Sequence, residues 1–154
     1  MQRTMLAAKL HRVRVTNAVL DYEGSCGIDE ALLDASGILP NERIDIYNVS
    51  NGERFSTYAI RAPRDSGEIS LNGAAARKVA IGDLLIICAY AAYGAAEAAA
   101  HQPKVILVDH DNRMRTAREM KQPDMTQAAP LVVRPRSPSD THAADRVKTA
   151  TPQQ

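Results

Sequence analysis

The sequence of 154 residues has no tryptophan and one phenylalanine, and aromatic residues make up only 4% of it. A core with so few large side chains must be built mainly from small and aliphatic residues, and we expect oligomerisation to support it. Apolar residues form 45% and charged residues 24% of the chain. This length and composition suit one globular domain followed by a tail.

An excess of charge of one sign and a long hydrophobic run are also missing. The 19 basic and 18 acidic side chains nearly cancel, so the sequence gives no support to nucleic acid as a partner. The longest apolar run, 84–96, is shorter than the roughly 20 residues that span a membrane. The N-terminal residues contain no hydrophobic stretch typical of a signal peptide. We therefore expect a cytoplasmic protein without a membrane partner.

Motifs for metals and common cofactors are absent. Cys26 and Cys88 are the only cysteines and form no CxxC motif, so we expect two reduced thiols. The histidines show no paired ligand spacing, which predicts no metal site. Glycine-rich phosphate-binding motifs and the Gly-x-Ser-x-Gly motif of serine hydrolases do not occur. The four histidines are His11, His101, His110 and His142.

Short runs of β-strand character dominate the chain. Two of them approach the apolar–polar alternation of a half-buried strand. Asn51-Gly52 separates two such runs, which predicts a hairpin closed by a type I′ turn. About seven short strands favour a compact barrel or sandwich. The expected strands include 10–15, 43–49, 55–60, 68–71, 84–93 and 104–109.

The expected helices are short. Asp29 can cap a helix of barely two turns that Gly37 ends. Residues 74–78 can form a single turn, and the alanine-rich segment 95–100 can be helical.

From Pro123 onward the composition changes, because five of the eight prolines lie there with almost no apolar pattern. Such a segment buries too little apolar surface to offset the entropy of ordering it. We therefore predict a folded domain over 1–122 and a disordered, proline-rich tail over 123–154.

The most distinctive local element is Gly24-Ser25, which lies between two strand-like segments. A serine hydroxyl can attack the preceding carbonyl where the backbone is strained, and a preceding glycine has no Cβ to block it. The ester that results can hydrolyse to a free serine amine. Alternatively, β-elimination and loss of ammonia convert the serine to a pyruvoyl ketone. Taken alone, this dipeptide is far more often a simple turn.

The surrounding motifs make the chain resemble the bacterial aspartate 1-decarboxylase family from Arg3 to about Asn112. This resemblance implies a small, six- to seven-stranded double-psi β-barrel that assembles as a homotetramer with active sites between subunits. It also implies a zymogen that cleaves itself between Gly24 and Ser25 into chains 1–24 and 25–154. The motifs are Arg3-Thr4-Met5-Leu6, Lys9-Leu10-His11-Arg12-Val13, Tyr22-Glu23-Gly24-Ser25-Cys26, the segment 51–60, Asn72-Gly73-Ala74-Ala75-Ala76 and Gly82-Asp83.

The same resemblance implies the reaction and its cofactor. Ser25 becomes a pyruvoyl group, which forms a Schiff base with L-aspartate and accepts the electrons left when CO₂ departs. The product is β-alanine for pantothenate biosynthesis, and neither a metal nor PLP is needed. The resemblance leaves open an accessory maturation factor.

Site residues follow from the resemblance position by position. Tyr58 corresponds to the proton donor, and Thr57 to a residue that assists self-processing at Gly24 and lies by the substrate. Lys9 and Arg54 correspond to cations for the substrate carboxylates, and the stronger of the two is expected to hold the retained carboxylate. The substrate-side loop is Asn72, Gly73, Ala74 and Ala75.

Each of these residues also has a purely structural interpretation. Lys9 and Arg54 can be solvated strand charges, Thr57 and Tyr58 ordinary strand residues, and Asn72-Gly73 a turn.

Other nearby residues receive little weight or differ from the family. His11 and Tyr22 flank the cleavage region but serve structural roles equally well, and Cys26 is best interpreted as a small buried hydrophobe. Three positions depart from the family pattern. Asp21 stands where the family often has His, Tyr47 where it often has Trp, and Arg77 where it often has His.

The residues alone are also compatible with two other functions. If the ester hydrolyses, Ser25 becomes the N-terminal nucleophile of an amidohydrolase. If Gly24-Ser25 is only a turn, the chain is a small β-barrel binding module without activity.

Overall fold

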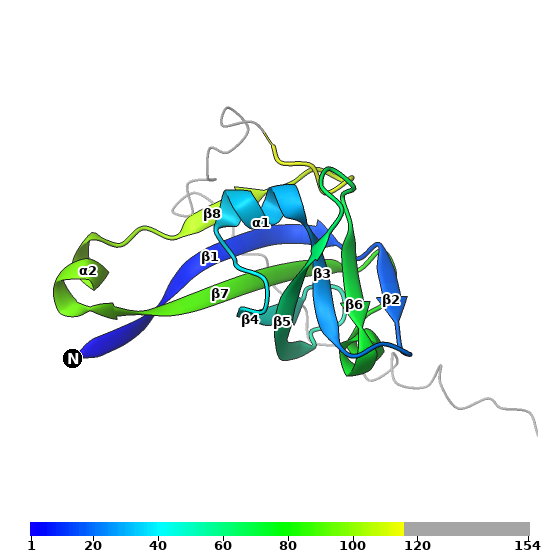
Figure 1. Cartoon of the computed structure of the whole chain (residues 1–154), viewed down its shortest axis with the longest axis horizontal. Coiled ribbons are helices and arrows are strands. Elements are labelled where there is room, and N and C mark those ends of the chain that lie inside the picture. Colours follow the sequence, from blue (N-terminus) through cyan, green and yellow to red (C-terminus); the bar gives the residue numbers. More distant parts are fainter. Residues whose placement is uncertain (116–154) are drawn as a thin grey trace, which may run out of the picture. The chain divides into compact units, whose positions relative to one another are not determined.

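The computed structural model describes residues 1–115, so the tail predicted for 123–154 and the end of the predicted 1–122 domain lie outside the described residues. Eight strands, two α-helices and one 3₁₀ helix follow one another along the chain (Figure 1). None of these helices is long and apolar enough to cross a membrane. The elements are β1 (Gln2–Arg14), β2 (Asn17–Val19), β3 (Ser25–Asp29), α1 (Glu30–Ser36), β4 (Arg43–Asn48), β5 (Arg54–Ala62), β6 (Ile69–Asn72), η1 (Gly73–Lys78), β7 (Leu84–Gly94), α2 (Ala95–Ala100) and β8 (Lys104–Leu107).

The strands form one mixed sheet that closes into a barrel. Its order is β2-β6-β3-β5-β4-β7-β1-β8. β2 follows β1 directly along the chain, and between them the backbone N–H of Thr16 donates to the carbonyl of Ile69 at 2.9 Å. The chain itself thus joins β2, at one end of the strand order, to β1, which lies next to β8 at the other end. The predicted mainly β barrel with short helices is confirmed, although it has eight strands in place of six to seven.

The interior of the barrel is aliphatic, as the sequence predicts. The buried core of the described residues includes no aromatic side chain, and Phe55 is only partly buried against it. Alternation along β4 and along the first four residues of β7 sends every second side chain inward. The largest fully buried aliphatic side chains are Leu10, Val13, Val15, Ile28, Leu32, Ile44, Ile46, Ile69, Leu71, Leu85 and Ile87.

The predicted short helices are confirmed. The Asp29 side chain accepts a hydrogen bond from the Ala31 N–H at 2.8 Å and so caps α1. Gly37 ends this helix with a φ of +77°, and its N–H bonds the Leu33 carbonyl. The expected turn at 74–78 is part of η1, and the alanine-rich segment forms α2.

The predicted hairpin of β4 and β5 is confirmed, but the predicted type I′ turn is wrong. A five-residue loop, 49–53, joins the strands. A type I′ turn needs positive φ at both central residues, whereas Gly52 has a φ of +83° and Asn51 is not among the residues with positive φ. The Asn48 and Asn51 side chains instead accept hydrogen bonds from backbone N–H groups two residues ahead, which stabilises a longer loop.

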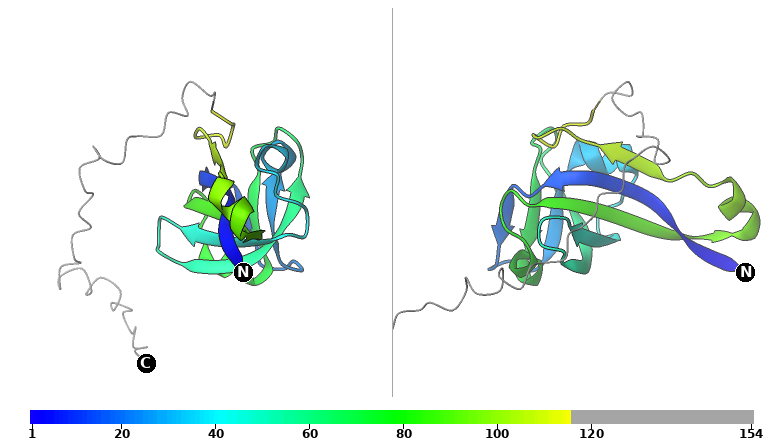
Figure 2. Two further views of the ribbon diagram at one scale, coloured as in Figure 1. Left: turned by 90° about the vertical axis from the view of Figure 1, so that its left-hand side faces the viewer. Right: turned by 180° about the vertical axis from the view of Figure 1, so that it is seen from behind.

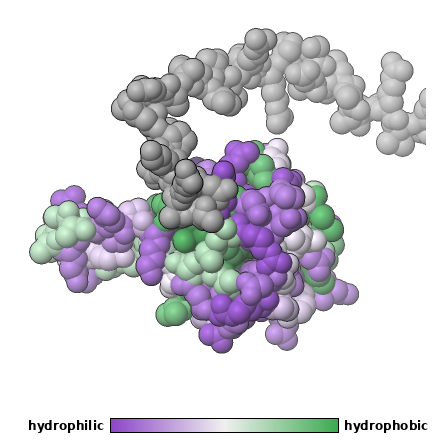
Figure 3. Space-filling view, turned by 90° about the horizontal axis from the view of Figure 1, so that it is seen from above, coloured by the Kyte–Doolittle hydropathy of each residue, from purple (hydrophilic) through white to green (hydrophobic). Residues whose placement is uncertain are grey.

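β1 and β7 extend beyond the barrel as a two-stranded arm (Figure 2). They pair from Arg14↔Leu84 to Gln2↔Gly94, whereas β4 pairs with β7 only as far as Cys88 and β8 pairs with β1 only from Ala8. β1 starts at Gln2, eight residues before the start of the strand predicted at 10–15. Small apolar side chains of α2 lie near the tip of the arm (Figure 3).

Candidate active site

The backbone at Gly24-Ser25 is strained. Ser25 is the first residue of β3 and is 1% exposed. Gly24 has a φ of +101° and Ser25 a φ of +107°. A side chain rarely tolerates that region, so the conformation of Ser25 is costly and must be held by its surroundings. The strain therefore lies at the bond that the sequence singles out.

Asn72 holds the hydroxyl of Ser25. The two residues face each other in the antiparallel pairing of β3 and β6. The Nδ2 atom of Asn72 donates to the Oγ atom of Ser25 at 3.1 Å, and both side chains are buried. This contact fixes the Ser25 hydroxyl within a buried environment.

Gly73 brings its backbone directly against Gly24. A Cβ atom at Gly73 would lie 2.9 Å from the Cα and N atoms of Gly24 and from the carbonyl oxygen of Tyr22. Such an approach is possible only for glycine, whose φ here is +64°. Ala74 is exposed and Ala75 half-buried in the helical turn that follows.

Thr57 and Tyr58 lie on the other side of β3. β3 and β5 run parallel, with Cys26 opposite Ala59, so Thr57 and Tyr58 are level with the Gly24-Ser25 peptide bond. The Tyr58 hydroxyl lies 4.0 Å from the position of a Cβ at Gly24. Tyr58 is 37% exposed, so this residue lies partly at the surface.

Lys9 and Arg54 lie on strands other than that of Ser25, Lys9 on β1 and Arg54 at the start of β5. Lys9 is opposite Cys88 in the pairing of β1 and β7. Burial raises the pKa of Cys88, whereas a hydrogen bond from Tyr90 and the positive charges of Lys9 and Arg54 lower it. Both cations therefore act on the same position. Within residues 1–115 neither has a carboxylate at ion-pair distance.

The predicted site residues thus fall into two groups. The structure brings the first group together around the Gly24-Ser25 bond, and Lys9 and Arg54 form the second. Among the described residues, no hydrogen bond or ion pair joins the two groups within one chain. The first group comprises Gly24, Ser25, Thr57, Tyr58, Asn72 and Gly73, with Ala74 and Ala75 adjoining.

Sequence reasoning missed a partner of Arg54. The ring of Tyr47 lies under the Arg54 guanidinium, and the Tyr47 hydroxyl bonds that of Tyr90. The sequence marks Tyr47 only as a departure from the family pattern, and it assigns no role to Tyr90. The available signal was a pair of phenols, Tyr90 and Tyr93, in a predicted strand at 84–93 whose other residues are nearly all aliphatic.

The cysteines, Tyr22 and His11 differ in how deeply they are buried near the site. Cys26 is fully buried, and burial raises its pKa to about 12, so its interpretation as a small hydrophobe is confirmed. Both cysteines are free thiols, as predicted. Tyr22 is 56% exposed. His11 is half-buried with its Nδ1 atom unpaired within the described structure, and burial followed by the charges of Lys9 and Arg12 lowers its pKa.

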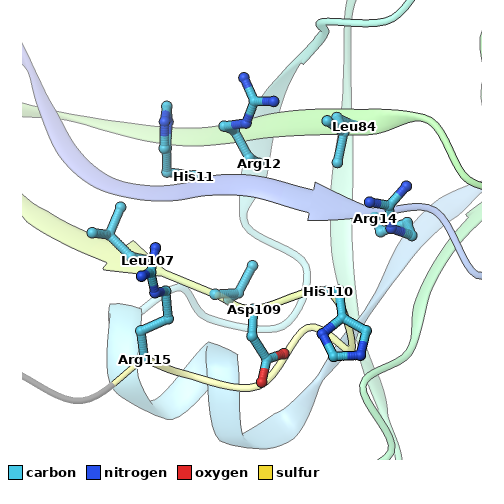
Figure 4. Close-up of a pocket in the computed structure, with 9 residues that line it drawn as sticks. His11, Arg12, Arg14, Leu84, Leu107, Asp109, His110 and Arg115 are labelled. Atoms are coloured by element: carbon cyan, nitrogen blue, oxygen red, sulfur yellow. The ribbon is translucent and has the colours of Figure 1, made fainter. Parts of the chain in front are cut away.

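A cavity of about 340 Å³ lies near the end of β1 and contains none of the predicted site residues. In Figure 4 the side chains of His11 and Arg12 point away from Asp109, so the basic groups do not converge on one point. Asp109, His110 and Asp111 bring ligand atoms within 4.8 Å of one another, but all three are exposed. Exposed groups of this kind do not by themselves make a metal site.

Known proteins match most of this chain. A model of the family "Aspartate decarboxylase" matches residues 1–115. The chain is similar to the aspartate 1-decarboxylases of Methylobacillus flagellatus (64% identity, 77% of this chain and 94% of the relative), Bordetella avium (63%, 77% and 98%) and Ralstonia pickettii (60%, 77% and 99%). Among solved structures, it is similar to the rationally designed protein mkDPBB_sym_86, with a TM-score of 0.40 and 14% identity over 51% of this chain and 92% of that chain.

Proposed function

Because the chain belongs to the aspartate decarboxylase family, we propose that it converts L-aspartate to β-alanine and CO₂ with a pyruvoyl group made from its own Ser25. The observation that carries this proposal is the strained Gly24-Ser25 bond, whose serine hydroxyl is buried and held by Asn72. The resemblance to the family assigns the product to pantothenate biosynthesis.

Self-cleavage starts at the Ser25 hydroxyl. The Oγ atom attacks the carbonyl carbon of Gly24, a C–O bond forms, and the C–N bond breaks, so that an ester replaces the amide and the Ser25 amine is released. Loss of the Cα proton then expels the Gly24 carboxylate and leaves dehydroalanine. Water replaces its nitrogen, ammonia leaves, and a ketone remains at the new N-terminus. Relief of strain at Ser25 favours the first of these steps.

The side chains around this bond have separate roles in the cleavage. Asn72 fixes the attacking oxygen. Gly24 offers no Cβ to obstruct the attack. The proposed role of Thr57, supported by its level in the pairing of β3 and β5, is to donate a hydrogen bond to the Gly24 oxygen as negative charge develops on it. Gly73 allows the close packing that keeps the loop in place.

Decarboxylation uses the same group together with the two cations. The pyruvoyl group supplies a carbonyl for the substrate amine and an electron sink for the charge left by CO₂. Tyr58 protonates the substrate α-carbon, because its hydroxyl lies 4.0 Å from the position of a Cβ at Gly24, the residue before Ser25. Lys9 and Arg54 bind the carboxylates of aspartate. These groups account for the reaction without a metal or PLP.

A homotetramer with active sites between subunits would bring the two groups of residues together. Two observations support it. Among the described residues of one chain, no hydrogen bond or ion pair joins the cations to Ser25, and no further described strand pairs with the outer half of the β1–β7 arm. A two-stranded ribbon is marginally stable by itself, so a neighbouring subunit is its natural support.

Intact-protein mass under denaturing and reducing conditions tests the proposal. We expect two chains, 1–24 and 25–154, the larger lacking one ammonia relative to a serine terminus, and CO₂ release from L-aspartate. The Ser25→Ala variant is the control: it removes only the hydroxyl of the nucleophile, and it should stay uncut and inactive.

Each alternative predicts a different result in the same experiment. A split with the amine retained would favour an amidohydrolase. A chain that stays uncut on prolonged warming, and also after incubation with a cell extract able to supply a maturation factor, would leave the binding module as the better interpretation.

A further inference from the structure

A hydrogen-bonded pair of tyrosines lies beside Arg54. The Cζ atom of Arg54 lies 4.1 Å from the centroid of the Tyr47 ring, and the Tyr47 and Tyr90 hydroxyl oxygens are 2.9 Å apart. Tyr47 faces Arg54 in the pairing of β4 and β5. Tyr90 lies on β7, which borders β4 on its other side. Three adjacent strands therefore each contribute one side chain to this group.

Stacking leaves the guanidinium of Arg54 available to a ligand. An arginine on an aromatic ring uses its flat face, so its N–H groups at the edges remain free. Within the described part of the chain, no carboxylate lies at ion-pair distance from Arg54. The free edge can therefore bind a carboxylate through two parallel hydrogen bonds.

The bond between the two hydroxyls restrains the Tyr47 ring. Without it, an aromatic ring near the surface can rotate about its side-chain bonds, and the arginine stacked on it would move as well. The hydrogen bond with Tyr47, and secondly burial, raise the pKa of Tyr90. Its hydroxyl therefore keeps its proton at physiological pH, and the link persists.

We propose that Tyr47 and Tyr90 are positioning residues: Tyr47 supports the guanidinium of Arg54, and Tyr90 locks the Tyr47 ring, so that Arg54 is held ready for a carboxylate of aspartate. This inference rests on the proposed function. Neither tyrosine is placed at the Gly24-Ser25 bond, so the pair acts on substrate binding and not on cleavage or bond breaking.

The Tyr90→Phe and Tyr47→Phe variants test the link, with KM and kcat measured on protein whose complete cleavage is verified by mass. Loss of one hydrogen bond should raise KM for L-aspartate roughly threefold to tenfold, with kcat changed by less than about twofold. The double variant should match either single variant, because all three lack the same bond. Tyr93→Phe is the matched control, since it removes a phenol hydroxyl from the same strand at a ring that packs on His101.

The Tyr47→Ala and Tyr47→Trp variants separate stacking from the link. Alanine removes the ring, so KM should rise beyond the value of Tyr47→Phe. Tryptophan restores a broad face for the guanidinium, and its KM should lie below that of the alanine variant. Succinate has two carboxylates but no amine. Its affinity should likewise be lower in Tyr47→Ala than in Tyr47→Phe or Tyr47→Trp. A purely structural role would instead lower thermal stability and kcat together.

The outcomes distinguish this inference from the function on which it rests. If the fully cleaved wild-type protein releases no CO₂ from L-aspartate, the proposed function is wrong and the inference falls with it. If the wild type is active but Tyr90→Phe leaves KM and succinate affinity unchanged, only the inference is wrong. Additive effects in the double variant would also overturn it, because they exclude a shared bond.

Discussion

The attacking atom of the candidate site depends on one side chain in the described structure, since Asn72 donates to the Ser25 Oγ atom. We predict that Asn72→Ala slows the appearance of chains 1–24 and 25–154. Loss of a hydrogen bond worth about 1 kcal/mol corresponds to roughly fivefold in rate. Mass spectrometry of freshly prepared protein at successive times measures the split. A rate equal to wild type would show that the bond does not orient the hydroxyl.

Gly73 and Gly52 form a matched pair for testing the packing against Gly24. Both have positive φ, but a Cβ at Gly52 meets nothing within 4 Å, whereas one at Gly73 meets backbone atoms at 2.9 Å. Gly52→Ala should cost about 1 kcal/mol from backbone conformation alone and leave cleavage normal. Gly73→Ala should cost more and slow cleavage, because the Gly24 loop must shift. Chemical denaturation and the same mass assay check both effects, and equal behaviour would contradict the prediction.

At this scale the residue types of the site could be predicted from sequence, but their conformation could not. The motifs identified Ser25, Tyr58 and Asn72 by resemblance. The positive φ of Ser25 depends on Asn72 and Gly73, which are almost 50 positions away in the chain and which meet it only after β3 and β6 pair. The Tyr47–Tyr90 bond likewise depends on two strands, β4 and β7, that adjoin only in the fold.

Among the elements, α1 depends on a carboxylate that serves more than the helix. Asp29 is 1% exposed. It accepts hydrogen bonds from the N–H groups of Ala31, Asp65 and Gly67 at 2.8, 3.0 and 2.8 Å. The same side chain thus caps α1 and holds the loop that leads into β6.

We predict that Asp29→Ala lowers the free energy of unfolding by about 3 to 5 kcal/mol, since it leaves three N–H groups without an acceptor. Asp29→Asn should cost about 1 to 2 kcal/mol, because one oxygen remains to accept. Both are best measured by urea denaturation in the Ser25→Ala background, where the chain stays uncut. Equal losses for the two substitutions would show that the hydrogen bonds are not the cause.

Elements with local signals were predictable, and elements defined by their neighbours were not. Asp29 and Gly37 mark the two ends of α1 in the sequence itself. β3 reads Ser-Cys-Gly-Ile-Asp, which has no strand character, and its five residues are all buried between β5 and β6. The turn at Asn51-Gly52 was predicted wrongly because the Asn48 and Asn51 side chains stabilise a longer loop.

At the scale of the whole molecule, β1 contributes to both the arm and the closure of the barrel: its N-terminal half pairs with β7 in the arm, and its C-terminal end leads to Thr16. Thr16 and Ile69 close the barrel over 53 positions, which no local pattern indicates. β1 and β7 leave the barrel beyond Cys88 and continue together to Gly94. Ala92, near the end of the arm, is exposed in the single chain. In the proposed tetramer a second subunit would cover part of this ribbon.

We predict that Ala92→Glu reduces the mass of the assembly in solution, because it places a charge on a surface that another subunit would bury. Ala80→Glu is the matched control: the same substitution at an exposed alanine in the turn between η1 and β7, away from the arm. Light scattering coupled to size exclusion gives the masses, and activity should fall with dissociation, since the cations and Ser25 would then be separated. A wild-type protein that remains monomeric at high concentration would contradict the tetramer, and unchanged assembly of Ala92→Glu would place the subunit contact elsewhere.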